Sequence, residues 1–332
     1  MTQKKERPLN SKFQRIIFTL NFLGWLGIFS NHSNLNADPL KSFSSSQDVA
    51  AQTSISFLDK SPFPQQKRAT TAEPPAQISI ASFNIRIFSN KSRSEQELSL
   101  IAKLLRKYDV IAIQELRDEK VLKRTITILK NLGYSYQYDL SDPVGTKTAH
   151  ELYAFLYRSD KVQLIQKGLI YKNAPEKFIR PPFYANFKAG NFDFTLMTIH
   201  ILFGKNKSLR RPEILALANA YQTIQQKDGK ENDLILLGDF NMSPDDAGFQ
   251  QLKSIPTMHC LILPPEKTTI TDTSLYDNFW FQRQYVKEYT GLSGINRFDE
   301  TMFGNDDEKA KLAISDHRLV WSVYNIATDD DD

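Results

Sequence analysis

The sequence predicts one layered domain of the α/β or α+β class, in which helices alternate with strands and several strands follow one another directly. Three observations predict it. Short β-branched runs recur, first at residues 78–84 and 110–115. The segment Ser94-Glu-Gln-Glu97 is a capping box that opens a helical pattern. The composition, 41% hydrophobic and 24% charged, suits a globular protein with a large core.

The remaining elements follow from the same patterns. A second helix is expected at residues 119–132, because Gly133 is a common residue just after a helix. Strands at residues 153–157 and 192–199 precede a third helix, which has Pro212 in its first turn and runs to about residue 226. Further strands are expected at residues 234–241, 279–281 and 319–324.

The predicted domain, residues 77–327, is flanked by segments of different character. Residues 1–37 combine a basic stretch with an apolar run that is short for a membrane span, so we predict a signal peptide and an exported protein, secreted or periplasmic. An uncleaved membrane anchor is the alternative. Residues 38–76, rich in Ser, Gln, Pro and Thr, are expected to be a linker, and residues 328–332 an acidic tail.

The net charge of +4 comes from the N-terminal segment. Residues 1–37 contain five basic residues and one acidic residue, so the rest of the chain has no net charge. Overall charge therefore gives no argument for nucleic-acid binding, which would need a local basic patch. A single cysteine, Cys260, excludes an internal disulfide and leaves the cellular compartment open.

Polar residues stand where the predicted strands begin or end. Asp239 and Asn241 stop the apolar run LILLG two residues apart, so on an extended chain their side chains would point to the same side. An ordinary Asp/Asn-rich turn is the alternative interpretation. The other positions of this kind are Asn84, Glu115, His200, Asp277, Asp316 and His317.

These strand ends are expected to form one polar cluster, because neighbouring strand ends converge in space. A group of carboxylates is costly unless a cation neutralises it. Oxygen ligands favour Mg²⁺, Mn²⁺ or Ca²⁺ over zinc. The two histidines are candidates for proton transfer or phosphate contact.

The segments that carry these residues resemble the endonuclease/exonuclease/phosphatase superfamily, and within it deoxyribonuclease I. The matching segments occur in the family's order: IASFNIR at 80–86, KYDVIAIQELRD at 107–118, SDPVG at 141–145, GDFN at 238–241, YD at 276–277 and AISDH at 313–317. GDFN and SDH indicate only the superfamily, whereas Gln-Glu-X-Arg-Asp with Ala-Ile-Ser-Asp-His points to the deoxyribonuclease I branch. The resemblance implies a four-layered sandwich, two packed β-sheets flanked by helices. It also implies a divalent-metal-dependent endonuclease that hydrolyses DNA phosphodiester bonds with little sequence specificity.

The resemblance also implies roles for the residues of the cluster. Glu115 would be the principal ligand of Mg²⁺ or Mn²⁺, with Asn84 and Asp316 beside it. Asp239 and Asn241 would hold the scissile phosphate, the attacking water or a second cation.

Two histidine–carboxylate pairs are implied as well, His317 with Asp277 and His200 with Glu151. Each carboxylate would orient its imidazole, so that one histidine activates water and the other protonates the leaving oxygen.

Three residues would contact DNA as the substrate. Arg117 matches an arginine that enters the minor groove, Arg180 matches one that contacts a phosphate, and Tyr276 is assigned to substrate binding. No obligate protein partner is expected, and we predict a monomer.

The chain departs from the family pattern in three places. Ala149 replaces a groove-stacking tyrosine, the family's disulfides cannot form, and residues 266–272 keep only part of a structural calcium loop. A role for Ca²⁺ in addition to Mg²⁺ therefore stays open.

Other functions on the same fold are a sphingomyelinase, a phosphoinositide phosphatase, an abasic-site nuclease and an inert binding module. Arg117 and the Glu151–His200 pair favour DNA over a lipid headgroup. An abasic-site nuclease is at odds with export, and an inert relative would be expected to lose ligands that this chain keeps.

Overall fold

The structure is a computed structural model that describes residues 76–172, 178–204, 206–227 and 232–327. The predicted signal peptide, nearly all of the linker and the whole acidic tail lie outside the described residues, so those assignments stay predictions. Within the described ranges, no helix combines the length and hydrophobicity that a membrane crossing requires.

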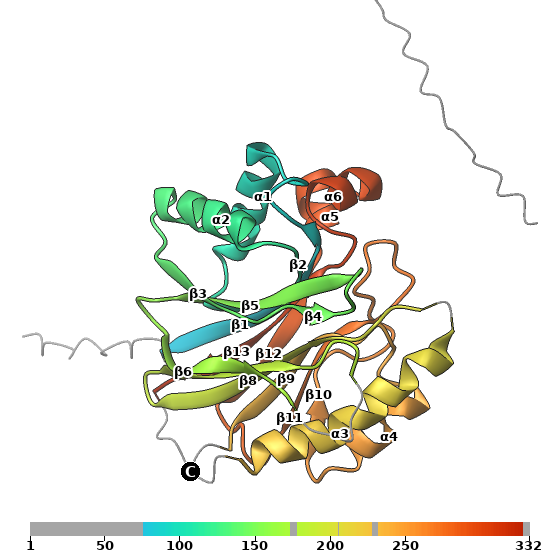
Figure 1. Ribbon diagram of the computed structural model, residues 1–332. Coiled ribbons are helices and arrows are strands. Elements are labelled where there is room, and N and C mark those ends of the chain that lie inside the picture. The colour runs from blue at the N-terminus through green and yellow to red at the C-terminus, as the bar shows by residue number, and fades with distance from the viewer. Residues whose placement is uncertain (1–75, 173–177, 205, 228–231, 328–332) are drawn as a thin grey trace, which may run out of the picture. The chain divides into compact units, whose positions relative to one another are not determined.

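Two mixed β-sheets form the centre of the domain (Figure 1). The first contains β1 (Gln77–Phe88), β2 (Val110–Leu116), β3 (Tyr136–Leu140), β4 (Val144–Gly145), β5 (His150–Arg158), β12 (Tyr289–Asn296) and β13 (Leu319–Asn325). The second contains β6 (Gln163–Ile170), β7 (Phe183–Ala189), β8 (Phe192–His200), β9 (Leu234–Asp239), β10 (Met258–Cys260) and β11 (Asp277–Gln282). The strand orders are β12-β13-β1-β2-β5-β3, with β4 paired to β5, and β10-β11-β9-β8-β7-β6.

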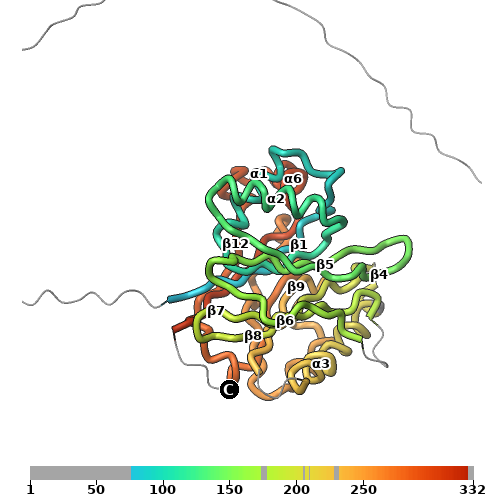
Figure 2. Tube along the Cα trace, turned by 60° about the vertical axis from the view of Figure 1, so that its left-hand side comes forward, coloured from blue at the N-terminus to red at the C-terminus, as the bar shows by residue number. Residues whose placement is uncertain are grey.

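Helices cover the outer face of each sheet, as Figures 1 and 2 show from two directions. The helices over the first sheet are α1 (Glu95–Leu105), α2 (Glu119–Asn131), α5 (Phe298–Phe303) and α6 (Asp307–Ala313). Those over the second are α3 (Arg211–Gln225) and α4 (Gln250–Lys253), with short 3₁₀ turns at Lys207–Leu209 and Ala247–Phe249. The predicted four-layered sandwich is confirmed. The capping box also forms, with both the Ser94 and Glu97 side chains bonded to the opposite backbone amide.

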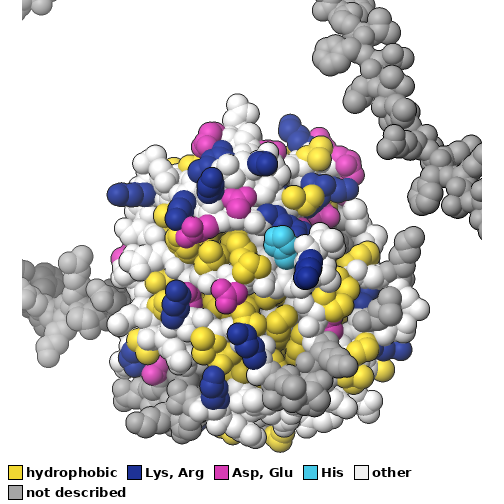
Figure 3. Space-filling view, viewed as in Figure 1, with side chains coloured by type: hydrophobic (Ala, Val, Ile, Leu, Met, Phe, Trp, Pro, Cys, Tyr) yellow, Lys and Arg dark blue, Asp and Glu magenta, His cyan; other side chains and the backbone are white. Residues whose placement is uncertain are grey.

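Basic and acidic side chains are interspersed on the face shown in Figure 3, with hydrophobic side chains between them. That face therefore presents no broad patch of a single charge. Any attraction for a charged substrate on it must come from a few local groups.

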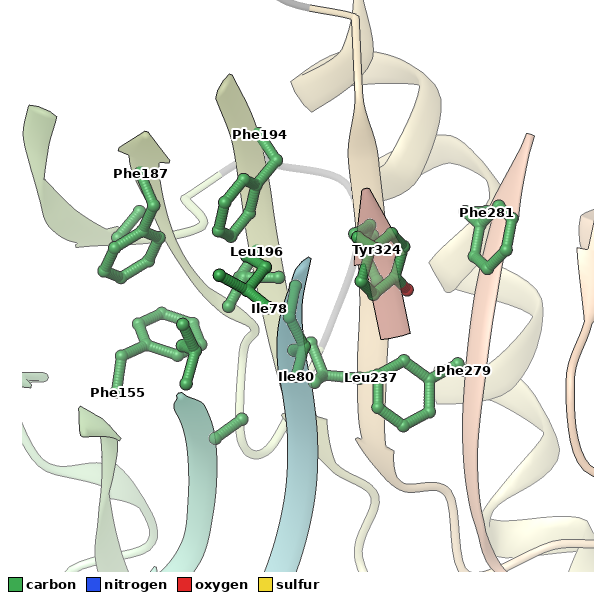
Figure 4. Packing of buried hydrophobic residues seen from close by; sticks show 14 of the residues in the cluster. Ile78, Ile80, Phe155, Phe187, Phe194, Leu196, Leu237, Phe279, Phe281 and Tyr324 are labelled. Carbon is green, nitrogen blue, oxygen red and sulfur yellow. The ribbon is translucent and has the colours of Figure 1, made fainter. Parts of the chain in front are cut away.

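Aromatic side chains fill the space between the two sheets (Figure 4). Phe155 of the first sheet meets Phe187 of the second edge-to-face, with 5.5 Å between ring centroids, and Phe187 stacks on Phe194 at 5.7 Å. Burial of each such ring stabilises the fold by about 1.5–3 kcal/mol. This packing holds the two sheets rigidly together, which fixes the positions of the strand ends.

Three strand ends of the second sheet lie in one row. β8 and β9 run parallel with His200 opposite Asp239, and β11 runs antiparallel with Asp277 opposite the same Asp239. Gly238 makes this row possible, because it has a φ of +148° and a Cβ there would lie 2.0 Å from the Ile199 carbonyl oxygen. The glycine of the GDFN segment is therefore required for the close approach of β8 and β9.

Candidate active site

Asn84 joins the two sheets at the polar cluster. It lies on β1 of the first sheet and is almost fully buried. Its Nδ2 donates to Asp239 Oδ2 of the second sheet at 2.9 Å and lies 3.4 Å from Glu115 Oε1 of β2. The strand ends of both sheets thus converge on one place, as the sequence predicted.

Asp239 is the centre of the cluster and is fully buried. Its Oδ2 lies 3.4 Å from His200 Nε2 and 3.7 Å from His317 Nε2. Burial alone would raise the pKa of Asp239, but the charges of His317 and His200 and the Asn84 hydrogen bond lower it. The carboxylate therefore stays ionised between the two imidazoles.

Asn241 lies beside Asp239 for a reason that differs from the predicted one. β9 ends at Asp239, and Asn241 has a φ of +49°, so the chain is no longer extended there. The Asn241 amide donates to Asp239 Oδ1 at 2.8 Å, and its Nδ2 donates to the Ile201 carbonyl at 2.8 Å. A tight turn, not an alternating strand, brings the two side chains together.

His317 and Asp277 form the first predicted pair. His317 Nδ1 lies 2.9 Å from Asp277 Oδ2, and Asp277 is fully buried at the start of β11. Burial would lower the pKa of His317, but the carboxylates of Asp277 and Asp239 outweigh it and raise that pKa well above its usual value. Burial raises the pKa of Asp277 despite the opposing charge of His317.

His200 and Glu151 form the second predicted pair. His200 Nδ1 lies 2.7 Å from Glu151 Oε1, which leaves His200 Nε2 facing Asp239. Burial would raise the pKa of Glu151, but His200 and Arg180 lower it to about 2. Each histidine therefore has a carboxylate behind it and presents Nε2 to the same central carboxylate.

Arg180, which the resemblance assigns to a phosphate contact, is largely buried behind His200. It is 8% exposed, and its Nη1 donates to Glu151 Oε2 at 2.7 Å while its Nη2 donates to the Ile201 carbonyl at 3.1 Å. Burial makes these bonds necessary, because an unpaired guanidinium in the interior would be costly. In this position Arg180 orients Glu151, and its Nη1 also lies 2.8 Å from His200 Nδ1.

Arg117 and Tyr276 lie at the edge of the cluster. Arg117 is about one-third exposed, its Nη1 donates to the His150 carbonyl at 2.6 Å, and its Nη2 lies 3.8 Å from Glu115 Oε2. The Tyr276 ring lies 6.4 Å from the His317 ring, centroid to centroid. Both side chains are near enough to the cluster to meet a bound substrate.

The donor groups around Glu115 fit a hard divalent cation. Asn84 Oδ1 is buried and has no hydrogen-bond partner among the described residues, which suits an oxygen that ligates a metal. Glu115 lies at a register shift of β2, has a φ of +59°, and accepts a 2.9 Å hydrogen bond from the Ile87 amide. Asp316 directly precedes His317, and its charge contributes to the raised pKa of that histidine.

A second group of possible ligands overlaps the first histidine pair. Asp239, Asp277 and His317 each offer a ligand atom, and these atoms lie within 4.8 Å of one another. Sequence reasoning placed a possible second cation at Asp239 and Asn241. In the structure Asn241 Nδ2 lies 3.4 Å from Asp239 Oδ2, beside this group.

Two arginines bind the segment in which the sequence suggested a partial calcium loop. Arg318 is 1% exposed, pairs with Asp299 at 2.5 Å and also bonds to Asp272. Arg297 lies 3.3 Å from Asp272 and 3.5 Å from Glu266. Guanidinium groups thus neutralise these carboxylates. Because Arg318 directly follows His317, this network also fixes the histidine's backbone.

Glu213 is a buried acid near the site that sequence reasoning missed. It lies on α3, is 3% exposed, and burial raises its pKa to about 7 against the opposing charges of Arg180 and His200. The helical pattern around Pro212 gave no signal, because a glutamate in a first helical turn is ordinarily exposed.

We expect Glu213→Gln to stabilise the protein at about pH 8 and to leave its stability unchanged below about pH 4.5. In the wild-type chain, Glu213 loses its proton near pH 4.5 in the unfolded state and near pH 7 in the folded state. The free energy of unfolding therefore falls as the pH rises between those values. The glutamine amide does not titrate, so the variant avoids this fall in the free energy of unfolding, which amounts to about 3 kcal/mol. Thermal unfolding at both pH values measures it, with the exposed Glu308→Gln as control. Identical pH dependence in wild type and Glu213→Gln would contradict the prediction.

Comparison with known proteins identifies the family. The profile of the Endonuclease/Exonuclease/phosphatase family matches residues 81–317, which span nearly all of the described domain. The chain belongs to the endonuclease/exonuclease/phosphatase family. Its enzymes are hydrolases of the phosphodiesterase or phosphatase type that use divalent metals, and the acidic and histidine groups described above suit that chemistry.

Relatives within this family include deoxyribonucleases. Deoxyribonuclease-1 of Gallus gallus is 31% identical over 264 residues, which cover 73% of this chain and 90% of the chicken protein. A deoxyribonuclease of Thioalkalivibrio sp. is 28% identical and covers 75% of this chain and 71% of its own length.

Solved structures of the family share the fold. The crystal structure of D. rerio TDP2 complexed with single strand DNA product has a TM-score of 0.53 at 18% identity and covers 75% of this chain and 99% of that one. The human Nocturnin catalytic domain with bound sulfate has a TM-score of 0.52 at 15% identity, with 75% and 94% coverage. Likeness at these identities concerns the fold alone.

Proposed function

We propose that this member of the family is a divalent-metal-dependent endonuclease that cuts DNA with little sequence specificity. The observation that carries the proposal is the pair of histidines on either side of Asp239, each backed by its own carboxylate. The names of the relatives support DNA as the substrate. Arg117 at the edge of the cluster supports it further, because one cation can contact a phosphate of the bound strand.

The residues of the chain have separate tasks in this proposal. Glu115, Asn84 and Asp316 would hold the metal ion, which when bound polarises the phosphate and stabilises its developing charge. Asn241 Nδ2 and the Asp239 carboxylate border the space between the histidines and would position the phosphate and the attacking water. One histidine Nε2 would take the proton of the water, and the other would give a proton to the leaving oxygen.

The carboxylates behind the histidines determine which ring nitrogen exchanges the proton. Asp277 and Glu151 each accept from Nδ1, so the proton that moves is the one on Nε2. Arg180 fixes Glu151, and the network of Arg318 fixes the backbone after His317. The two imidazoles are therefore held in place before substrate binds.

Incubation of the purified protein with supercoiled plasmid, sphingomyelin and a phosphoinositide, each with Mg²⁺, Mn²⁺ or EDTA, tests the proposal. We expect plasmid nicking that requires a divalent metal, and no turnover of either lipid. Lipid hydrolysis without nicking would assign the site to a phosphodiesterase or phosphatase of the same family with another substrate. No turnover of any substrate with either metal would favour an inert binding module.

Arg117→Ala is expected to weaken plasmid cutting through substrate binding. With no net charge outside residues 1–37, local cations supply most of the attraction for DNA. We expect a higher KM for DNA and a nearly unchanged kcat. The slope of log KM against the logarithm of the salt concentration should be smaller than that of the wild type by about one. Steady-state kinetics at several salt concentrations measure this.

The controls for Arg117 separate binding from chemistry. Lys130→Ala removes an exposed cation from the last turn of α2 and should leave cutting unchanged. A small phosphodiester substrate offers no groove, so Arg117→Ala should hydrolyse it at the wild-type rate. Equal losses on DNA and on the small ester would mean that Arg117 serves the chemistry.

A further inference from the structure

An exposed aromatic ring stands beside the candidate active site. Phe203 lies on the loop that follows β8 and is 61% exposed, more than any other large hydrophobic residue in the described part of the chain. The other large hydrophobic residues exposed in that part are aliphatic. Single exposed aliphatic residues are common and need no explanation. Exposure of a phenylalanine ring to water costs more free energy than exposure of an aliphatic side chain.

Arg210 holds this ring in place. Its guanidinium carbon lies 4.4 Å from the Phe203 ring centroid, a cation–π contact. The arginine itself is only 5% exposed, and its Nε donates to the Gly204 carbonyl at 3.1 Å. One face of the ring is thus covered by a fixed cation, and the large exposed fraction leaves the opposite face accessible.

The same arginine connects the ring to the site. Arg210 Nη1 donates to the Asn241 carbonyl at 2.5 Å, so the ring centroid lies within about 8 Å of that oxygen, given ordinary bond lengths. The loop is fastened at its start as well, because the Ile201 amide donates to the Asp239 carbonyl at 2.9 Å. Nucleotides of one strand are spaced by about 3.4 Å when stacked and by more when extended. The ring is therefore within a few nucleotides of a phosphate bound at Asp239.

We propose that Phe203 is a stacking platform for an unpaired nucleobase next to the scissile phosphate. The proposal rests on the proposed action on DNA and specifies it further. A base stacks on an aromatic ring whatever its identity, because every base has a flat π face. A base inside a duplex already stacks on its neighbours and must be displaced before it can meet the ring. The site would therefore favour single-stranded, nicked or frayed DNA near the cut.

A nucleobase fits this ring better than a lipid surface does. Membrane insertion needs a broad apolar area. Among the described residues, the exposed large hydrophobic side chains adjacent in sequence to the site are Ile87, Ile179 and Phe203, and Ile87 stands beside the charged Arg86. A ring held with one face over a buried guanidinium presents its other face, which is the surface on which a base stacks.

Binding of a labelled oligothymidine with nuclease-resistant phosphorothioate linkages, followed by fluorescence anisotropy in Mg²⁺, tests the proposal. We expect Phe203→Ala to weaken binding about tenfold and Phe203→Trp to preserve it. The control ligand is an oligomer of the same length that carries abasic sites. Phe203→Ala should leave the affinity for this oligomer unchanged. Leu263→Ala removes a side chain of similar exposure on another loop and should leave both ligands unaffected.

Three results would overturn the proposal: no binding of oligothymidine by the wild-type protein, unchanged binding by Phe203→Ala, or equal weakening for the normal and abasic oligomers. Loss of binding to sphingomyelin vesicles in Phe203→Ala, with oligothymidine binding intact, would assign the ring to a membrane instead. This binding assay does not depend on turnover. Failure of the proposed nuclease function would appear separately, as an absence of plasmid nicking by the wild-type protein.

Discussion

Replacement of Glu115 by alanine is expected to reduce plasmid nicking by about a thousandfold or more, because loss of a metal ligand removes several kcal/mol of transition-state stabilisation. Glu115 Oε1 lies 3.4 Å from Asn84 Nδ2, and the Oδ1 of the same asparagine has no partner among the described residues. Together they supply both a charged and a neutral oxygen to a cation. Nicking rates over a range of Mg²⁺ concentrations, with Mg²⁺ affinity from calorimetry, measure the effect.

The controls for Glu115 isolate the metal. Glu308→Ala removes a carboxylate that is 79% exposed on α6 and should leave nicking unchanged. In EDTA the wild-type protein and Glu115→Ala should be equally inactive, because both then lack the ion. A variant that nicks at the wild-type rate in Mg²⁺, or that binds Mg²⁺ with unchanged affinity, would contradict the assignment.

The backbone at two site residues is held in an unfavourable conformation. Glu115 has a φ of +59° and Asn241 a φ of +49°, values that cost residues other than glycine about 1 kcal/mol or more. Local bonds sustain both conformations. The Ile87 amide donates to Glu115 Oε2, and the Asn241 side chain bonds to the Ile201 carbonyl. This conformational cost is consistent with the proposed function, because it turns both side chains toward the cluster.

Local patterns predicted those parts of the fold that local forces determine. The capping box at Ser94 predicted the start of α1, and the glycine after residue 132 placed the end of α2 to within one residue. Six strands were missed, β3, β4, β6, β7, β10 and β12, and two of them show why. β6 is an edge strand with many exposed polar residues, and β12 contains two glycines, so neither carries a hydrophobic run. Each pairs with the next strand along the chain, β7 or β13, but its own residues give little signal of that pairing.

Residues at the strand ends were predictable because chain order and sheet pairing bring them to the same edge. Contacts between distant segments were not predictable. Arg180, Arg210 and Arg318 look alike in the sequence, yet each is buried and bonds to acceptors that only the fold brings near. A buried arginine needs several such acceptors, and the sequence does not reveal which ones it finds.

Loss of either histidine is the second large effect that we expect. His317→Ala and His200→Ala should each lower plasmid nicking by about a hundredfold to ten-thousandfold, the usual contribution of a general acid or base. The geometry is nearly symmetric, with both Nε2 atoms within 3.7 Å of Asp239 Oδ2, so DNA cutting alone cannot tell the acid from the base.

A substrate with a better leaving group separates the two histidines. The p-nitrophenyl ester of thymidine 5′-phosphate expels p-nitrophenolate, which needs no proton, whereas attack by water still needs a base. We therefore expect one variant, and not the other, to regain most of its activity on this ester. The variant that recovers lacks the general acid. Asp277→Asn or Glu151→Gln should follow the behaviour of the histidine that it orients, because each carboxylate bonds to Nδ1 of only one imidazole. Recovery of both variants, or of neither, would contradict a division of the two proton transfers between His200 and His317.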